Sequence, residues 1–410
     1  MIDYKRLWLK IAIIFFFFTA FAGLFLRLLP FLDDFDNKYH FGVLQSHSHT
    51  GFLGWVFIAL YAFLINTFGT QNLIGKKKTV RILIILTVLL LGIYISFPLD
   101  GYGVFSITFL SLFLIYSYYT LVYFYKNIDS KYNKTIIKKF LLWGIVLYFI
   151  SSIGPWALGP VIAGGYKSTK LYYDTIFFYL HFLYNGFITF SIIALYLKLF
   201  WEKIENNSNR KKCMFFSFIA LLSGTFLSYS ESLLWHNPSL YVHFISVLSA
   251  LFILYAVFCL YKTIEGIQIH YNKIEKYLIT FTLIFFILKI VLQFFQAFPY
   301  FSKISYLFKG QFIIGYIHLV TLGFISLFLI FYSISTQIIK SGRLFKTGIY
   351  FYLTGFLLTE VLLFFQGILL LNSIYILSPS FNLLMLVFSL VIFIGILLIL
   401  INSLYKKAQN

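Results

Sequence analysis

Charged side chains are scarce in this chain. They make up 11% of its 410 residues, and hydrophobic residues make up 61%, whereas soluble domains carry about 25% charged residues. The chain also has only two cysteines, Cys213 and Cys259, which show no thiolate-metal spacing and no disulfide framework. There is no Gly-rich phosphate loop, Ser-His-Asp order or zinc-protease spacing. These absences exclude an ordinary soluble domain and several common enzyme classes.

The sequence contains long apolar runs. A run of about 18–25 residues can cross a hydrocarbon core of about 30 Å as a helix. No connection between the runs is long enough for a soluble domain, so we expect one integral membrane domain over residues 1–410, all-α and polytopic. The twelve predicted spans are 8–29, 43–68, 81–98, 103–125, 138–160, 174–200, 213–232, 239–262, 276–298, 310–335, 345–368 and 380–405.

The net charge of +19 follows this predicted topology. If the N-terminus is cytoplasmic and the sides alternate, 25 of the 32 Lys and Arg residues fall in inside segments. That is the positive-inside bias, so the excess sets orientation and disfavours a nucleic-acid partner. We therefore expect both termini in the cytoplasm and a lipid bilayer as the partner. Heavy use of Phe, Ile, Lys, Tyr and Asn indicates a bacterial cytoplasmic membrane.

A short histidine signature recurs three times, at intervals of 132 and 137 residues. Imidazoles held inside a lipid-embedded bundle most often bind metals or haem. The spacing predicts three four-helix units, 1–130, 131–262 and 263–410, around a pseudo-threefold axis. In an α-helix the Gly would be rotated about 140° from the histidine, so it is expected to admit a neighbouring helix, with the aromatic as packing. The repeats are His49-x4-Gly54-Trp55, His181-x4-Gly186-Phe187 and His318-x4-Gly323-Phe324.

The other histidines divide into two groups. His47 lies two residues before His49, and His236 and His243 are predicted in the outer half of the bundle. His40 and His270 fall in predicted loops, where a histidine is usually a packing or surface residue.

Helix number and histidine positions together resemble a known family. Twelve helices, cytoplasmic termini and histidines near the outer ends of helices 2, 6, 7 and 10 resemble subunit I of the haem-copper oxidases. The stretch SHSHTGFLGW (46–55) is similar to one in NnrS-type haem- and copper-containing membrane proteins, and YIHLVTLGF (316–324) resembles the helix-10 histidine region of this group.

The resemblance implies cofactors and ligands. A low-spin, bis-His, b-type haem would be held by His49 and His318, with His47 as the competing ligand on helix 2. Copper or another metal would be held by His181 with His236 and His243.

The chain departs from the oxidase pattern at several positions. Tyr316 stands where oxidases have a second helix-10 histidine, so it is either an axial ligand or a packing residue. Asn185 stands where they have the cross-linked tyrosine, with Tyr184 one position earlier. The helix-6 glutamate has no counterpart. These departures count against a complete proton-pumping oxidase.

Four charged residues are predicted inside or near the spans. Lys289 and Glu360 lie well within spans, where an unpaired charge costs several kcal/mol, so we expect them to pair with each other or to form a proton pathway. Glu231 is expected to orient the His236 imidazole. Arg27, at the outer end of the first span, either meets a haem propionate or extends to the interface.

The sequence thus predicts a membrane haem protein in respiratory or nitric-oxide-related redox chemistry, oxidoreductase-like, with a redox protein or quinol as electron donor. The alternative is a non-redox transporter or a metal- or haem-handling protein on the same scaffold. A third reading is a structural subunit without cofactors. Oligomeric state cannot be inferred from the sequence.

Overall fold

The computed structural model describes residues 3–32, 37–372 and 378–404. Nearly all of these residues are helical, and the one β-type pairing among them is an isolated bridge between Gly69 and Ile128. The all-α prediction is therefore confirmed. The helices are α1 (Tyr4–Leu28), α2 (Asn37–His49), α3 (Ile58–Phe68), α4 (Lys77–Asp100), α5 (Val104–Lys126), α6 (Ile136–Ser151), α7 (Ile153–Ala163), α8 (Lys170–Leu180), α9 (Thr189–Lys198), α10 (Trp201–Ile204), α11 (Ser208–Leu227), α12 (Leu240–Ile264), α13 (Lys273–Gln296), α14 (Pro299–Leu307), α15 (Lys309–His318), α16 (Leu327–Ser335), α17 (Arg343–Leu371) and α18 (Ser378–Leu404).

Shorter helical segments of other types connect or continue these helices. Four are 3-10 segments, and three are π-helical, with i→i+5 hydrogen bonds. The 3-10 segments are η1 (Leu29–Phe31), η3 (Leu73–Gly75), η4 (Ser130–Tyr132) and η6 (Ser228–His236). The π-helical segments are η2 (Thr50–Phe57), η5 (His181–Ile188) and η7 (Leu319–Ser326).

Twelve helical stretches of the described chain are long and apolar enough to span a membrane. The predicted ends differ from the observed ones by at most about five residues, so the span prediction is confirmed. The stretches are Tyr4–Phe31, Tyr39–Phe68, Lys77–Asp100, Val104–Lys126, Ile136–Ala163, Lys170–Lys198, Ser208–His236, Leu240–Ile264, Lys273–Gln296, Gly310–Ser335, Arg343–Leu371 and Ser380–Leu404.

The chain forms two compact units. Unit 1 contains Met1–Ile128, Tyr271–Thr282 and Thr321–Asn410, and unit 2 contains Asp129–His270 and Leu283–Val320. The division at 128/129 lies close to the first predicted repeat boundary. The third predicted repeat, 263–410, is shared between the units, and the prediction of one domain built from three repeats stays a prediction.

Each histidine signature coincides with a π-helical segment. In the first and third, the histidine is the last residue of an α-helix (α2 or α15) and the π segment follows directly; in the second, His181 is the first residue of η5. The glycine nevertheless faces a different neighbour from the histidine, as predicted. The His49 ring lies beside Phe97 of α4, whereas Gly54 lies against α1. His181 is hydrogen-bonded to α11, whereas Gly186 lies against α6.

The glycines of the first two signatures let a neighbouring helix approach closely, as predicted. A Cβ on Gly54 would lie 2.8 Å from Phe15 Cβ on α1, and one on Gly186 would lie 2.7 Å from Leu147 Cβ on α6. Either distance is too short for two carbon atoms, so only glycine fits.

The following aromatics also pack alike in the two units. Trp55 stacks on Phe16 at 4.5 Å, and Phe187 meets Tyr148 edge-on at 5.1 Å. Each unit 2 residue follows its unit 1 counterpart by 132 positions, as do the residues that meet the two glycines. The sequence repeat is therefore a repeat of helix packing.

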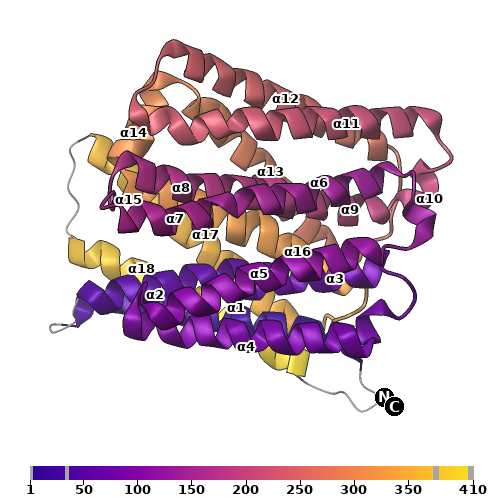
Figure 1. The fold of residues 1–410 in the computed structure, drawn as a ribbon, viewed down its shortest axis with the longest axis horizontal. Helices are drawn as coiled ribbons and strands as arrows, with labels where there is room; N and C mark the ends of the chain where they lie inside the picture. The colour runs from indigo at the N-terminus through magenta and orange to yellow at the C-terminus, as the bar shows by residue number, and fades with distance from the viewer. Residues whose placement is uncertain (1–2, 33–36, 373–377, 405–410) are drawn as a thin grey trace. The chain divides into compact units, whose positions relative to one another are not determined.

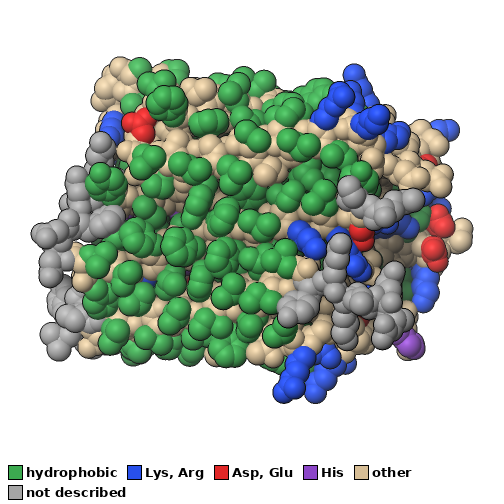
Figure 2. Space-filling view, turned by 90° about the horizontal axis from the view of Figure 1, so that it is seen from below, with side chains coloured by type: hydrophobic (Ala, Val, Ile, Leu, Met, Phe, Trp, Pro, Cys, Tyr) green, Lys and Arg blue, Asp and Glu red, His purple; other side chains and the backbone are tan. Residues whose placement is uncertain are grey.

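The described side chains also separate by polarity. Figure 2 shows one face, on which hydrophobic side chains cover a broad area and Lys and Arg side chains gather toward one end. A broad hydrophobic face with basic residues toward one end suits a bilayer.

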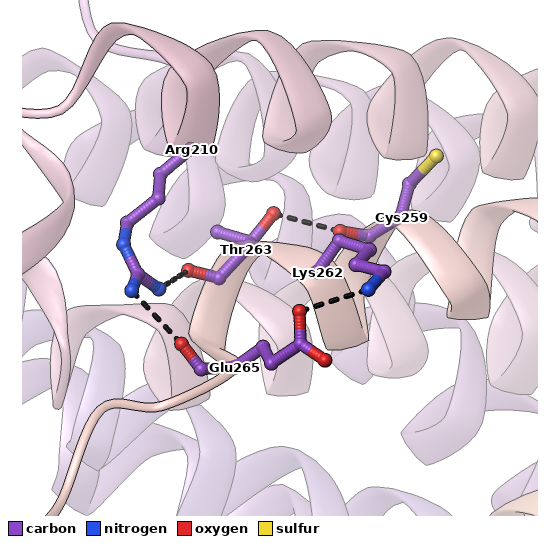
Figure 3. Close-up of polar contacts among 5 residues, drawn as sticks. All are labelled: Arg210, Cys259, Lys262, Thr263 and Glu265. Carbon is purple, nitrogen blue, oxygen red and sulfur yellow. Dashed lines mark hydrogen bonds and ion pairs between the residues drawn. The ribbon is translucent and has the colours of Figure 1, made fainter.

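Within unit 2, α11 and α12 lie side by side (Figure 1). Near the start of α11, the Arg210 guanidinium donates hydrogen bonds to two backbone oxygens at the end of α12, those of Thr263 at 2.7 Å and Glu265 at 2.8 Å (Figure 3). These carbonyls have no partner within their own helix, so Arg210 caps α12 and fixes the two helices at this end.

Candidate functional site

The His47 imidazole in unit 1 is anchored through one nitrogen. Nδ1 donates a hydrogen bond to the Thr19 carbonyl of α1 at 2.8 Å. Gly23, one turn further along α1, allows this placement, because a Cβ there would lie 2.8 Å from His47 Cε1. A proton on Nδ1 leaves the lone pair on Nε2, and metal-ligating histidines typically donate their other N–H to a backbone carbonyl in this way.

The His49 imidazole has an unsatisfied nitrogen. Its Nε2 is inaccessible to solvent and has no hydrogen-bond partner in the described part of the chain. The ring lies beside two aromatics, with centroid distances of 4.9 Å to Phe97 and 6.4 Å to Tyr102. A buried polar atom without a partner costs about 1–3 kcal/mol, so this nitrogen is a natural position for a ligand.

His181 in unit 2 is different, because both of its ring nitrogens are satisfied. Nε2 donates to the Thr225 carbonyl of α11 at 2.8 Å, and Nδ1 accepts from Asn185 Nδ2 at 3.2 Å. The side chain is only 2% exposed. With this pattern neither nitrogen offers a lone pair to a metal, and His181 behaves as a buried hydrogen-bonding residue joining η5 to α11.

His236 and His243 each use one ring nitrogen within unit 2. His236 Nε2 donates to Asp174 on α8, at 2.8 Å to Oδ1 and 3.0 Å to Oδ2, and His243 Nδ1 donates to the Ala297 carbonyl at 2.8 Å. Asp174 is thus the residue that orients His236. It lies 62 positions away, and no sequence pattern linked the two.

The predicted metal ligands are not gathered into a metal-holding group. Over the residues that the structure describes, no set of three or more His, Cys, Asp or Glu side chains is placed to hold a metal ion. Each of the three histidines His181, His236 and His243 is instead hydrogen-bonded to a separate partner.

His318 ends α15 in unit 2, directly before η7. Two positions earlier, the Tyr316 ring meets Tyr184 of η5 edge-on at a centroid distance of 6.4 Å. The Tyr316 hydroxyl is buried. Tyr184 and Tyr316, which the sequence singled out separately, are therefore neighbours.

The predicted role of Glu231 needs correction, because its carboxylate interacts with α12 and α13. Oε2 accepts from Gln293 Nε2 at 2.8 Å and Oε1 from Ser249 Oγ at 3.2 Å. The residue that orients His236 is Asp174 instead.

Lys289 and Glu360 likewise have partners inside their own units. Lys289 Nζ donates to Gln293 Oε1 at 3.1 Å and interacts electrostatically with Glu231. Glu360, 6% exposed on α17, interacts electrostatically with Arg27 of α1. This electrostatic interaction gives Arg27 a role that neither sequence reading included, and the expected Lys289–Glu360 pair stays a prediction.

Comparison with known proteins finds a likeness in structure but none in sequence. No family model matches the chain, and no curated protein matches its sequence. Among solved structures, it is similar to a haem-copper terminal oxidase determined as a dimer by cryo-electron microscopy. The TM-score is 0.66 at 12% identity, covering 100% of this chain and 86% of that one. At this identity the likeness concerns the fold alone. This chain is an all-α, multi-pass membrane protein with the fold of haem-copper oxidase subunit I.

Proposed function

We propose that the chain is a membrane haem-binding protein of haem-copper oxidase type whose haem is low-spin, b-type and ligated by histidine. His49 and His318 are the proposed ligands. The observation that carries the proposal is the buried His49 Nε2, which lacks a hydrogen-bond partner in the described residues. Coordination of iron would satisfy that nitrogen, and the oxidase-like fold supports haem as the ligand.

The helix-2 ligand has one competitor, His47. Its Nδ1–H is held by the Thr19 carbonyl, which leaves Nε2 with the lone pair that iron requires. Both histidines are therefore chemically suited, and the haem-binding proposal stands with either.

A bound haem would supply one-electron redox chemistry, with a potential set by its axial ligands and surroundings. The chain's own part is to present neutral imidazoles, exclude water with the surrounding aromatics and hold the rings in place. We propose a redox protein or a quinol as the electron donor, in the cytoplasmic membrane of a bacterium, and respiratory or nitric-oxide-related chemistry as the setting. A second metal near His181, His236 and His243 stays a prediction, and His181 is the weakest of the three.

The test is the optical spectrum of purified protein made with ample haem, with His49→Ala, His47→Ala, His318→Ala and the matched control His40→Ala. His40 is exposed on α2, so His40→Ala should keep the wild-type spectrum. His318→Ala and His49→Ala should each abolish the sharp reduced bands of a bis-imidazole haem. Loss in His47→Ala but not in His49→Ala would move the ligand role to His47. Absence of a Soret band in wild type, or no effect of any of the three substitutions, would refute the proposal and favour the non-redox alternative.

A further inference from the structure

Unit 2 contains a buried cluster of polar side chains that the proposed haem site does not use. Glu231 comes from η6, Ser249 from α12, and Lys289 and Gln293 from α13. Their exposed fractions are 7%, 0%, 3% and 3%. Ionisable residues in membrane spans are costly and mark functional sites more often than other residues do.

The side-chain amide of Gln293 lies between the Glu231 carboxylate and the Lys289 ammonium group. The Gln293 side chain donates to Glu231 through Nε2 and accepts from Lys289 Nζ through Oε1. No ion pair within 4.0 Å joins Glu231 to Lys289 among the salt bridges of the described chain. An interposed amide weakens the attraction relative to a direct contact pair, because the Coulomb energy falls with distance. The carboxylate is therefore held in place without a cation in direct contact.

Ser249 allows the site to satisfy either protonation state of Glu231. Its hydroxyl lies 3.2 Å from Glu231 Oε1 and 2.7 Å from the Ser246 carbonyl. When Glu231 is ionised, the Ser249 O–H can donate to the carboxylate. When Glu231 is protonated, the carboxyl O–H can donate to Ser249 Oγ while the Ser249 O–H donates to the Ser246 carbonyl. Neither state needs a movement of heavy atoms or leaves the carboxyl without a partner.

We propose that Glu231, with Ser249, Gln293 and Lys289, is a proton-binding site inside the membrane. The ligand is a single proton from water: the carboxylate becomes a carboxylic acid, and the Ser249 hydroxyl reverses its hydrogen bond. Binding neutralises a buried charge while Lys289 stays hydrogen-bonded to Gln293. The inference does not depend on the haem, because every group involved belongs to the chain.

Other titratable groups surround the site. Glu231 acts electrostatically on Tyr184 and Tyr316, and Lys289 acts on His181. The elements packed against η6 carry further titratable side chains, among them His243 on α12, Asp174 on α8, and Lys303 and Tyr306 on α14.

The test is infrared difference spectroscopy of the full chain in lipid across a pH titration, reading the C=O stretch of a protonated carboxyl group. Wild type should show a pH-dependent carboxyl band that Glu231→Gln removes and Glu360→Gln, the other buried glutamate, retains. Ser249→Ala should shift the band's frequency, because the acid loses its hydrogen-bond acceptor, and Ser249→Thr should restore it. Lys289→Met should move the titration midpoint to higher pH by about one unit or more, since an opposite charge favours the ionised carboxyl, whereas Lys289→Arg should move it less.

The proposal is overturned if no carboxyl band is lost in folded Glu231→Gln, or if the band is insensitive to both Ser249→Ala and Lys289→Met. If Glu231→Gln does not yield monodisperse protein, the Ser249 and Lys289 variants decide by the same criteria. Haem content, measured in the same samples, separates this result from the haem-ligand test: a carboxyl titration in haem-free protein supports the proton site even where the haem proposal fails.

Discussion

Trp55 Nε1–H donates a hydrogen bond to Ser326 Oγ at 2.8 Å, joining residues of η2 and η7 that are 271 positions apart. Both side chains are almost completely buried. The Ser326 hydroxyl in turn donates to the Thr321 carbonyl five residues earlier, at 2.7 Å. The Ser326 hydroxyl therefore accepts a hydrogen bond from the Trp55 indole and donates one within the π-helical segment η7.

We expect Ser326→Ala to destabilise the protein by about 1–3 kcal/mol, because the buried indole N–H would lose its acceptor. Thermal unfolding in detergent measures the effect. Combining Ser326→Ala with Trp55→Phe should cost less than the sum of the single substitutions, since the two residues share one interaction. Strict additivity would contradict the coupling.

Gly186→Ala should lower the unfolding temperature, because the added Cβ would lie 2.7 Å from Leu147 Cβ and overpacking of this kind costs about 1–3 kcal/mol. The matched control is Gly159→Ala on α7, where an added Cβ meets nothing within 4 Å. That change should leave stability unchanged or raise it, as alanine favours helix. Equal effects at both positions would argue against the close helix approach.

His181→Ala should destabilise the fold by about 1–3 kcal/mol, because the buried Thr225 carbonyl and the Asn185 amide would each lose a partner. It should leave the optical spectrum of any bound haem unchanged, in contrast to His49→Ala. Spectra and unfolding curves recorded on the same preparation check both points. A lost or shifted haem band would instead assign His181 to the cofactor.

Arg210→Met should lower stability by about 1–3 kcal/mol, because two carbonyls at the end of α12 would lose a charged donor. Arg210→Lys should recover only part of the loss, since a single ammonium cannot reproduce the planar two-point contact. Thermal unfolding of the two variants beside wild type gives the comparison. Full recovery by lysine would show that charge alone matters here.

The surface pair next to this cap gives a pH-dependent prediction. Lys262 Nζ donates to Glu265 at 2.9 Å, and this hydrogen bond lowers the pKa of the Glu265 carboxyl from its usual 4.5. A lowered pKa in the folded state adds stability that is present above pH 4.5 and lost as pH falls through the folded value. Lys262→Met should therefore lower stability slightly at neutral pH, and the difference from wild type should disappear as the pH falls below 4.5. A large effect at neutral pH would contradict a solvent-screened pair.

The spans and the histidine repeat could be predicted because their causes are local. The length of an apolar run predicts that it crosses the membrane. The 132-residue spacing of His49 and His181 predicts a repeated unit, and the two repeats share the same glycine contacts. The π-helical segments could not be predicted, since they depend on which backbone hydrogen bonds survive packing rather than on composition.

The sequence by itself determined that this protein is a twelve-span membrane bundle with histidines at repeated positions, because hydrophobic length, charge bias and residue spacing are properties of the chain. Only the tertiary structure decided the partners of each polar group. It paired His236 with Asp174, and Glu231 with Gln293 and Ser249. It also satisfied both nitrogens of His181 while leaving His49 Nε2 buried and without a hydrogen bond. Partner choice depends on which helices pack together, and residues tens or hundreds of positions apart meet only after that packing has formed.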